Sequence, residues 1–563
     1  MKHRLSILLV VIVVLGALMR LYDLSRGDAI SDEVLYGFRS IGYLDFDFAV
    51  AQPTTLQLIA PDTAELPLWT KLSFHDHPPL VFLVQHAFLK AIGANLWGLR
   101  LPSALFGIAS LYLAYVITKK LFSGPAAVIA AALMATHVLM IYVSRTGVQE
   151  SQVIFFILLS VYSFLKAQDK PHWYLGFGAV FGLALLSKYT AAYLVVPLML
   201  WLLIFDRRVF RKKELYLGAL LTLAIVSPVI IYNLMLLTTL GHLDFQLSYI
   251  FGQHVLYWQE TPGKQIGSLA DRFFGIFQNM WFFASPVSTL IFTGSFVLAF
   301  FRFRDPDRAT RKNLALLLLI MGATLLLLLA IGPSPRFLSM LIPWLVILAG
   351  STFAPMFVMK FRILAVGLLT LIIMWEGLFS VNSYILSRPF GREVVHYSRI
   401  HWDMHPWGFN ALDRYLGTLF RGRYPEHTIG YSLPWLNEIK HQALIRGRER
   451  GGEPLNALFI YNDNMSGLAS LWTLSRHALY GGWAILTLQN YTETLASKGD
   501  DFYQTQGFTE TYFIQNENSM LLNAPERITD LGATFEASLR ERSAPFDAVY
   551  ADDGTVAFRV YHF

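Results

Sequence analysis

The chain contains no cysteine and few charged residues. None of its 563 residues is Cys, and Asp, Glu, Lys and Arg together account for 15% of them, compared with about a quarter in a typical soluble domain. Without cysteine there are no disulfides and no cysteine-ligated metals, so a domain outside a membrane must be held together by packing. With 55% hydrophobic residues and a mean hydropathy of +0.46, the chain is predicted to be a polytopic membrane protein.

Several functional signals are also missing. No Gly-rich loop follows a predicted strand, which excludes the common phosphate loops of nucleotide-binding domains. No basic stripe with interleaved aromatic residues occurs, so the net charge of +6 indicates basic cytosolic loops and no nucleic acid partner. No repeat of about 20–50 residues is present, which excludes the repeat architectures.

Long apolar segments are what the chain has instead. A helix needs about 20 apolar residues to cross a bilayer, and the sequence predicts about 11 transmembrane helices. The first is predicted to be retained, because no small-residue cleavage pattern follows it. The predicted spans are about 5–22, 99–118, 124–143, 151–167, 173–187, 190–205, 215–238, 284–301, 313–331, 337–355 and 363–381.

A further apolar segment, Leu80–Gly93, is short and carries His86 and Lys90. If it did not span, every Lys- and Arg-rich loop would share the side of the N-terminus; if it spanned, all of these loops would lie outside. Basic loops favour the cytoplasm. We therefore predict an interfacial helix on the outer leaflet, a cytoplasmic N-terminus and an extracytoplasmic C-terminus.

This topology predicts two domains. Residues 1–381 form the transmembrane module, with long outer loops at about 23–98 and 239–283, and residues 382–563 form an extracytoplasmic soluble domain. The soluble domain alternates helical and strand-like runs, which indicates an α/β fold. Examples of these runs are 411–420, 457–461 and 556–560.

Ionisable residues gather at the predicted outer face. Asp32 and Glu33 follow the first span, and three basic residues, Arg100, Lys188 and Arg336, lie at outer ends of spans, where the positive-inside bias disfavours them. Each has a simpler alternative: the acids suit a helix start, and the basic side chains can extend to the headgroups. Together they favour transfer from a lipid phosphate, because cations balance a phosphate leaving group and a carboxylate takes the proton of an acceptor hydroxyl.

Short motifs along the first 355 residues or so occur in a recognisable order and spacing. The most specific is Arg-Leu-Pro-Ser-Ala-Leu-Phe-Gly at 100–107. The others are Ser31-Asp32-Glu33, His77-Pro78-Pro79-Leu80, Ser144-Arg145 with Glu150, Leu185-Leu186-Ser187-Lys188 and Pro335-Arg336-Phe337. With these motifs the chain resembles the polyprenyl-phosphate-sugar-dependent glycosyltransferases of the GT-C fold, the group that contains the protein O-mannosyltransferases and the lipid A aminoarabinose transferase.

The resemblance implies roles for individual residues. Asp32 matches the catalytic aspartate of the family, which engages the acceptor hydroxyl, and Glu33 is its usual companion. Glu150 stands where many relatives have Asp, as a second acid. Lys188 and Arg336 match positions that hold the lipid phosphate.

Three further positions carry implied roles. Arg100 matches a helix-start arginine on which relatives depend, and we group it with the donor phosphate site. Asp76 and His254 match positions at which some relatives place metal ligands. Because family members also work without a metal, a divalent metal is compatible with the site and not required.

The sequence thus predicts a multi-pass glycosyltransferase of the cell membrane. It would move a hexose or pentose from a polyprenyl-phosphate donor to an acceptor hydroxyl on a protein, a lipid or a glycan, at the extracytoplasmic face. One alternative is a secondary transporter or lipid-linked sugar flippase, which would place ionisable residues near the midplane and show two related halves. Another is a membrane-anchored receptor in which the C-terminal domain does the work.

Overall fold

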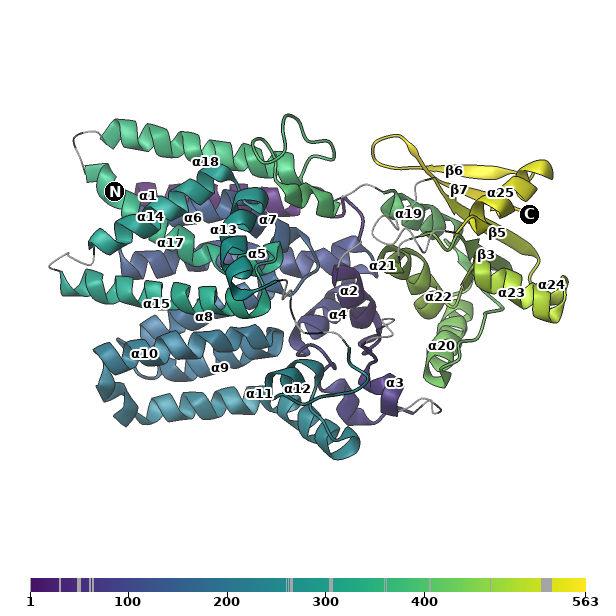
Figure 1. Ribbon diagram of the computed structural model, residues 1–563, viewed down its shortest axis with the longest axis horizontal. Coiled ribbons are helices and arrows are strands. Elements are labelled where there is room, and N and C mark those ends of the chain that lie inside the picture. Colours follow the sequence, from purple (N-terminus) through teal and green to yellow (C-terminus); the bar gives the residue numbers. More distant parts are fainter. Residues whose placement is uncertain are drawn as a thin grey trace. The chain divides into compact units, whose positions relative to one another are not determined.

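The computed structural model describes most of the chain and divides it into two compact units (Figure 1). The first unit comprises Met1–Ser25, Phe48–Pro53 and Leu68–Trp402, and the second comprises Arg26–Asp47, Thr54–Pro67 and Asp403–Phe563. The described residues are 2–29, 32–47, 52–59, 62, 65–259, 261, 263, 267–302, 307–358, 360, 362–404, 407–465, 467–517 and 529–563.

The first unit is helical, and each of the segments predicted to span contains a helix. These helices are α1 (Lys2–Leu21), α5 (Leu96–Leu121), α6 (Gly124–Thr136), α7 (Val138–Arg145), α8 (Glu150–Ala167), α9 (Trp173–Ser187), η2 (Tyr189–Leu194), α10 (Val195–Phe205), α11 (Lys213–Leu240), α14 (Pro286–Arg302), α15 (Arg308–Ile331), α16 (Pro335–Leu338), α17 (Ile342–Phe353) and α18 (Arg362–Tyr384). The shorter helices of its loops include η1 (Leu68–Lys71), α12 (Phe245–Ile250) and α13 (Leu269–Phe283).

Fewer helices than the predicted eleven are long enough to cross a membrane. Among the described residues, six helices are long and apolar enough to cross a membrane, or seven if α6 and α7 form one span bent by 58°. Four of the predicted spans are apolar helices of 10–17 residues: Leu5–Leu21, Trp173–Ser187, Tyr189–Phe205 and Pro286–Ala299. The helical, membrane-protein character is therefore confirmed, and the count of eleven stays a prediction.

Local sequence explains where these helices begin and end. Asn95 caps α5 by accepting from the Gly98 amide at 3.0 Å, and Gly241, at φ +80°, ends α11 in the left-handed conformation that glycine tolerates best. The bend between α6 and α7 falls at His137, whose Nδ1 accepts from the Leu139 amide at 3.2 Å and so starts a new helix.

Helix α4 (Leu80–Ile92) begins directly after Pro79. Its 13 residues rise about 20 Å, short of the ~30 Å hydrocarbon core. This length agrees with the interfacial helix expected from the sequence. The side of the membrane on which it lies stays a prediction.

The second unit has a mixed sheet covered by helices. The strand order is β4 (Ala484–Thr487), β3 (Ala457–Tyr461), β5 (Glu510–Asn516), β7 (Val556–His562) and β6 (Phe546–Tyr550). The first three strands are parallel, and β7 is antiparallel to both β5 and β6. A separate parallel pair is formed by β1 (Arg423–Tyr424) and β2 (Glu453–Pro454).

The helices of this unit are α19 (Phe409–Leu419), α20 (Pro434–Arg450), α21 (Gly467–Ser470), η6 (Leu471–Ser475), α22 (Arg476–Gly481), α23 (Leu488–Lys498), α24 (Phe502–Thr505) and α25 (Leu531–Glu541). Apolar residues of α19 pack on one face of the sheet and those of α23 and α25 on the other. Both runs predicted as strands are strands, so an α/β fold is found where the sequence indicated one.

Helices α2 (Asp32–Gly42) and α3 (Thr55–Ile59), from the first long loop, also belong to the second unit. The Tyr480 hydroxyl donates to the Phe38 carbonyl at 2.7 Å, and the Asn410 amide donates to Asp28 at 2.7 Å. Arg39 lies 3.1 Å from Asp47 in a buried ion pair. The packing of these helices against residues 403–563 was not predicted, because the partners lie several hundred residues apart in the sequence.

Candidate active site

Three of the predicted site residues meet at one point in the first unit. Lys188 Nζ lies 2.6 Å from Glu150 Oε1, and Arg336 Nη2 lies 3.2 Å from the same oxygen. Glu150 is fully buried and Lys188 nearly so. The structure therefore brings together two cations and one acid that lie 38 and 186 residues apart in the sequence.

Each member of this cluster stands at a helix end. Glu150 is the first residue of α8, where the positive end of the helix dipole favours a carboxylate. Lys188 follows α9 with an extended backbone, and Ser187 just before it accepts from Gln152 at 3.0 Å. Arg336 lies in α16, whose start is capped by Ser334. Because each residue is anchored at a helix end, the three charged side chains are held close to one another.

Charge-assisted hydrogen bonds between buried groups are strong, and a buried carboxylate left without its cations would be costly. Glu150 therefore orients Lys188 and Arg336 in addition to any part it plays as an acid. Lys188 Nζ also lies 4.8 Å from the centre of the Phe337 ring. A phosphate that approached this point would find both cations already fixed.

A second polar network supports the segment after Lys188. Asp244 accepts from the Tyr189 hydroxyl at 2.7 Å and from Asn233 at 2.9 Å, and it caps α12 through the Leu247 amide at 2.8 Å. Burial raises the pKa of Asp244. The network joins the second long loop to the residue that follows Lys188. This contact was not predicted from the sequence.

Gln149 lies next to Glu150 in the sequence and was not among the predicted site residues. It is fully buried, and within the described part of the chain neither of its amide atoms has a hydrogen-bond partner. Because an unsatisfied buried amide is costly, Gln149 is suited to bind the polar groups of a ligand beside Glu150. Its position in the short polar turn before Glu150 is the only sequence signal for it.

Arg100 serves the local structure. It is buried, and its Nη1 donates to the Leu24 carbonyl at 3.2 Å. Arg145 acts similarly, donating to the carbonyls of Tyr22 at 2.7 Å and Asp23 at 2.9 Å. Both arginines thus bind the carbonyls that follow α1. A phosphate-binding role for Arg100 stays a prediction.

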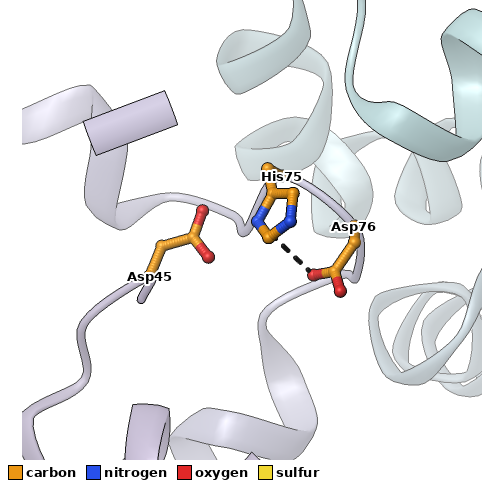
Figure 2. Close-up of side chains that lie close together, drawn as sticks. All are labelled: Asp45, His75 and Asp76. Carbon is orange, nitrogen blue, oxygen red and sulfur yellow. Dashed lines mark ion pairs between the residues drawn. The ribbon is translucent and has the colours of Figure 1, made fainter. Parts of the chain in front are cut away.

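The predicted metal ligands are Asp76 and His254. Asp76 lies beside His75, at 3.7 Å, and His77, at 3.0 Å; Figure 2 shows the His75–Asp76 pair, together with Asp45 of the second unit. Helix α12 holds this loop, because the Phe245 amide donates to the His75 carbonyl at 2.7 Å.

His254 is exposed, and among the described residues it is not in the group of potential metal ligands that contains Asp76. Histidine and carboxylate suit a divalent metal, but a catalytic zinc site generally needs three protein ligands. Among the described residues, the first unit contributes only His75 and Asp76 to that group, so we derive no step through a metal. The ligand pair Asp76 and His254 stays a prediction.

The predicted catalytic pair opens α2. Asp32 is half-buried and Glu33 is buried, both in the first helical turn, where acids favour the dipole; Ile30 and Ser31 lie outside the described residues. The simpler interpretation, that these two acids begin a helix, is therefore confirmed. The catalytic role of the two acids stays a prediction.

Comparisons with known proteins show which family part of the chain is similar to. Residues 76–232 match the sequence profile described as dolichyl-phosphate-mannose-protein mannosyltransferase, a stretch that contains Asp76, Arg100, Glu150 and Lys188. The resemblance to the GT-C glycosyltransferases is confirmed. Two candidate mannosyltransferases of Bacillus subtilis are similar to parts of the chain: YycA is 36% identical over 26% of this chain and 21% of its own, and YkcB is 28% identical over 41% and 32%. The chain thus matches a fifth to a third of the length of these relatives.

Solved GT-C structures share the fold over nearly the whole chain. ArnT from Cupriavidus metallidurans, bound to undecaprenyl phosphate, superposes with a TM-score of 0.54 at 12% identity, covering 100% of this chain and 98% of that one. The apo Archaeoglobus fulgidus oligosaccharyltransferase gives 0.52 at 14% identity, covering 99% and 74%. At such identities the likeness establishes the GT-C fold.

Proposed function

We propose that this protein is a membrane glycosyltransferase that moves a sugar from a polyprenyl-phosphate donor to an acceptor hydroxyl on the extracytoplasmic face. The observation that carries the proposal is the convergence of Lys188 and Arg336 on Glu150. Two fixed cations at helix ends suit a lipid phosphate, and the match of residues 76–232 to a lipid-phosphate-dependent family points to the same donor.

The reaction follows from these groups. The bond between the sugar anomeric carbon and the phosphate oxygen breaks, and the acceptor oxygen forms a bond to that carbon. Lys188 and Arg336 balance the charge that develops on the leaving lipid phosphate, and Glu150 keeps them oriented. Asp32 accepts the proton of the acceptor hydroxyl as general base, with Glu33 beside it in the same helical turn.

The names of the similar proteins suggest which lipid-linked sugar to test first. The similar ArnT structure is bound to undecaprenyl phosphate, and the Bacillus relatives carry mannosyltransferase names. Undecaprenyl-phosphate mannose is therefore the first donor to test. The acceptor class, whether a protein, a lipid or a glycan, is left for the assay.

The test is a donor-consumption assay on the whole protein in sealed vesicles. A panel of polyprenyl-phosphate hexoses and pentoses is added with a mixture of protein, lipid and glycan acceptors, and free polyprenyl phosphate is quantified. We expect at least one donor to be consumed by the wild type and to be spared by the Lys188→Ala variant. A lipid-linked sugar that crosses the bilayer unconsumed, in a parallel flux assay, would favour the flippase instead.

A further inference from the structure

The second unit contains a cavity of about 530 Å³ that plays no part in the proposed transfer. It lies at the carboxyl ends of two neighbouring parallel strands, because Tyr461 ends β3, Thr487 ends β4, and these two residues pair in register. Ligands in open α/β sheets bind outside the carboxyl ends of the strands, where the strand order reverses. Here the order β4-β3-β5 reverses at β3, whose last residue lines the cavity, and the volume is within the usual range for small-molecule sites.

One wall of the cavity is a single face of α23. Asn490, Glu493, Thr494 and Ser497 all line it, at the spacing i, i+3, i+4 and i+7 that places side chains on one side of a helix. The face presents an amide, a carboxylate and two hydroxyls. These groups can donate to or accept from the hydroxyls of a sugar.

Tyrosine rings add apolar surface to the lining of the cavity. Tyr431, Tyr461 and Tyr503 line the same cavity, and Tyr503 stacks on Tyr491 with ring centres 5.3 Å apart. Aromatic rings offer flat apolar area with a polar tip. A pyranose ring presents matching surfaces, an apolar C–H face and a rim of hydroxyls.

The charges of the lining argue against an anionic ligand. Among the described residues Lys440 is the only basic residue that lines the cavity. Its Nζ donates to the Ile429 carbonyl at 2.5 Å and lies 4.5 Å from the centre of the Tyr431 ring. Glu493, also in the lining, brings the formal charge of the lining residues to zero, and burial lowers the pKa of Lys440 to about 8.

From this lining we propose that the cavity is a binding site for a neutral mono- or disaccharide. The polar face of α23 disfavours a lipid chain, and a single lysine balanced by a glutamate disfavours a phosphorylated sugar. If the chain is the proposed transferase, the site would hold part of an acceptor glycan, and that use alone rests on the proposed function. Saccharide binding itself requires no transfer.

The test is saturation-transfer NMR on the full chain in phosphatidylcholine nanodiscs, which carry no sugar headgroup. The probes are methyl α-mannopyranoside, maltose and glucose 1-phosphate. We expect transfer signals from at least one neutral sugar with the wild type, and loss of these signals in Asn490→Trp, where the indole fills the cavity. Ala496→Trp, at an exposed position of α23 outside the lining, should keep them.

Melting curves of both variants show whether each remains folded. If Asn490→Trp does not fold, Asn490→Ala and Ser497→Ala replace it, and a weakened signal is then expected. Absence of signal from both neutral sugars with the wild type would overturn the proposal, as would signals that persist in a folded Asn490→Trp or that arise from glucose 1-phosphate alone. The donor-consumption assay is separate, so either proposal can fail while the other stands.

Discussion

Glu150 is the residue on which the proposed donor site depends. It holds Lys188 and Arg336 through one oxygen, at 2.6 and 3.2 Å, and either cation can contribute charge to a bound phosphate. The sequence could predict both cations, because basic residues at outer ends of spans are unusual. It could not predict their shared partner, since proximity across 186 residues is a property of helix packing.

Replacing either cation should impair use of the lipid donor. We expect Lys188→Ala and Arg336→Ala each to lower kcat/KM for the donor by about 100-fold, a typical loss for one electrostatic stabiliser of a leaving group. The measurement is donor kinetics in vesicles. Lys120→Ala, which removes a partly exposed ion pair with Asp169, is the matched control and should remain near wild type. Full activity in both site variants would exclude the donor site.

Asp28 should make stability fall as pH rises. Burial raises its pKa from 3.8 to about 6, so the folded state keeps the proton after the unfolded state has lost it. The stabilisation is complete below about pH 4 and disappears between about pH 4 and 6, amounting to about 3 kcal/mol at 1.4 kcal/mol per unit.

The measurement for Asp28 is thermal unfolding of the wild type and Asp28→Asn from pH 4 to 8. Asn keeps an oxygen to accept from the Asn410 amide and cannot ionise. We expect similar melting temperatures near pH 4 and a more stable variant at pH 8. Equal melting temperatures throughout the range would show that the Asp28 carboxyl does not titrate as described.

At the scale of elements, α9 and α11 pack with glycine at their contact. A Cβ at Gly178 would lie 2.0 Å from the Gly218 carbonyl oxygen, and one at Gly218 would lie 2.3 Å from the Tyr174 carbonyl oxygen. Thr222 also donates to the Gly178 carbonyl at 2.9 Å. Small residues let membrane helices approach this closely.

Gly178→Ala should therefore destabilise the protein, although alanine is the better helix former. A control is Gly322→Ala in α15, where nothing lies within 4 Å of the added Cβ; there the substitution should be neutral or stabilising by up to about 1 kcal/mol. Thermal unfolding in detergent measures both. A Gly178→Ala variant as stable as Gly322→Ala would contradict the close approach of α9 and α11.

The helices themselves were the most predictable elements. Each apolar segment that was predicted to span contains a helix, because a lipid-facing backbone must satisfy its hydrogen bonds within the helix. The break at His137 was not predicted, because Thr136 and His137 are the only polar residues of the segment 124–143 and no proline or glycine lies near the bend. How many of the shorter helices cross the bilayer depends on tilt and packing, which a hydropathy pattern does not encode.

At the scale of the whole molecule, the two units do not coincide with two sequence blocks. The sequence predicted the soluble domain from residue 382 onward, yet Arg26–Asp47 and Thr54–Pro67 cluster with Asp403–Phe563. Contacts such as Tyr480 with Phe38 join these segments. Composition can locate a domain, but it cannot show that a distant loop completes it.

The topology can be tested independently of any activity. The distribution of Lys and Arg predicts that the loop after Lys120 is cytoplasmic and that Phe563 lies outside. Reporter fusions at these two positions should give opposite signals. The same signal at both positions would mean that the predicted number of spans between them is wrong. The predicted site on the outer face would then be wrong as well.

The most direct measurement of the central claim is turnover of the lipid donor by Asp32→Asn. Asn preserves the size of the side chain and suits a helix start, but it lacks the basic oxygen. We expect sugar transfer to fall by about 100-fold or more, as for loss of a general base, while donor binding and melting temperature stay near wild type. Asp62→Asn, an exposed acid of the same loop, should leave transfer unchanged. A folded Asp32→Asn protein that binds donor and transfers sugar at the wild-type rate would contradict the account.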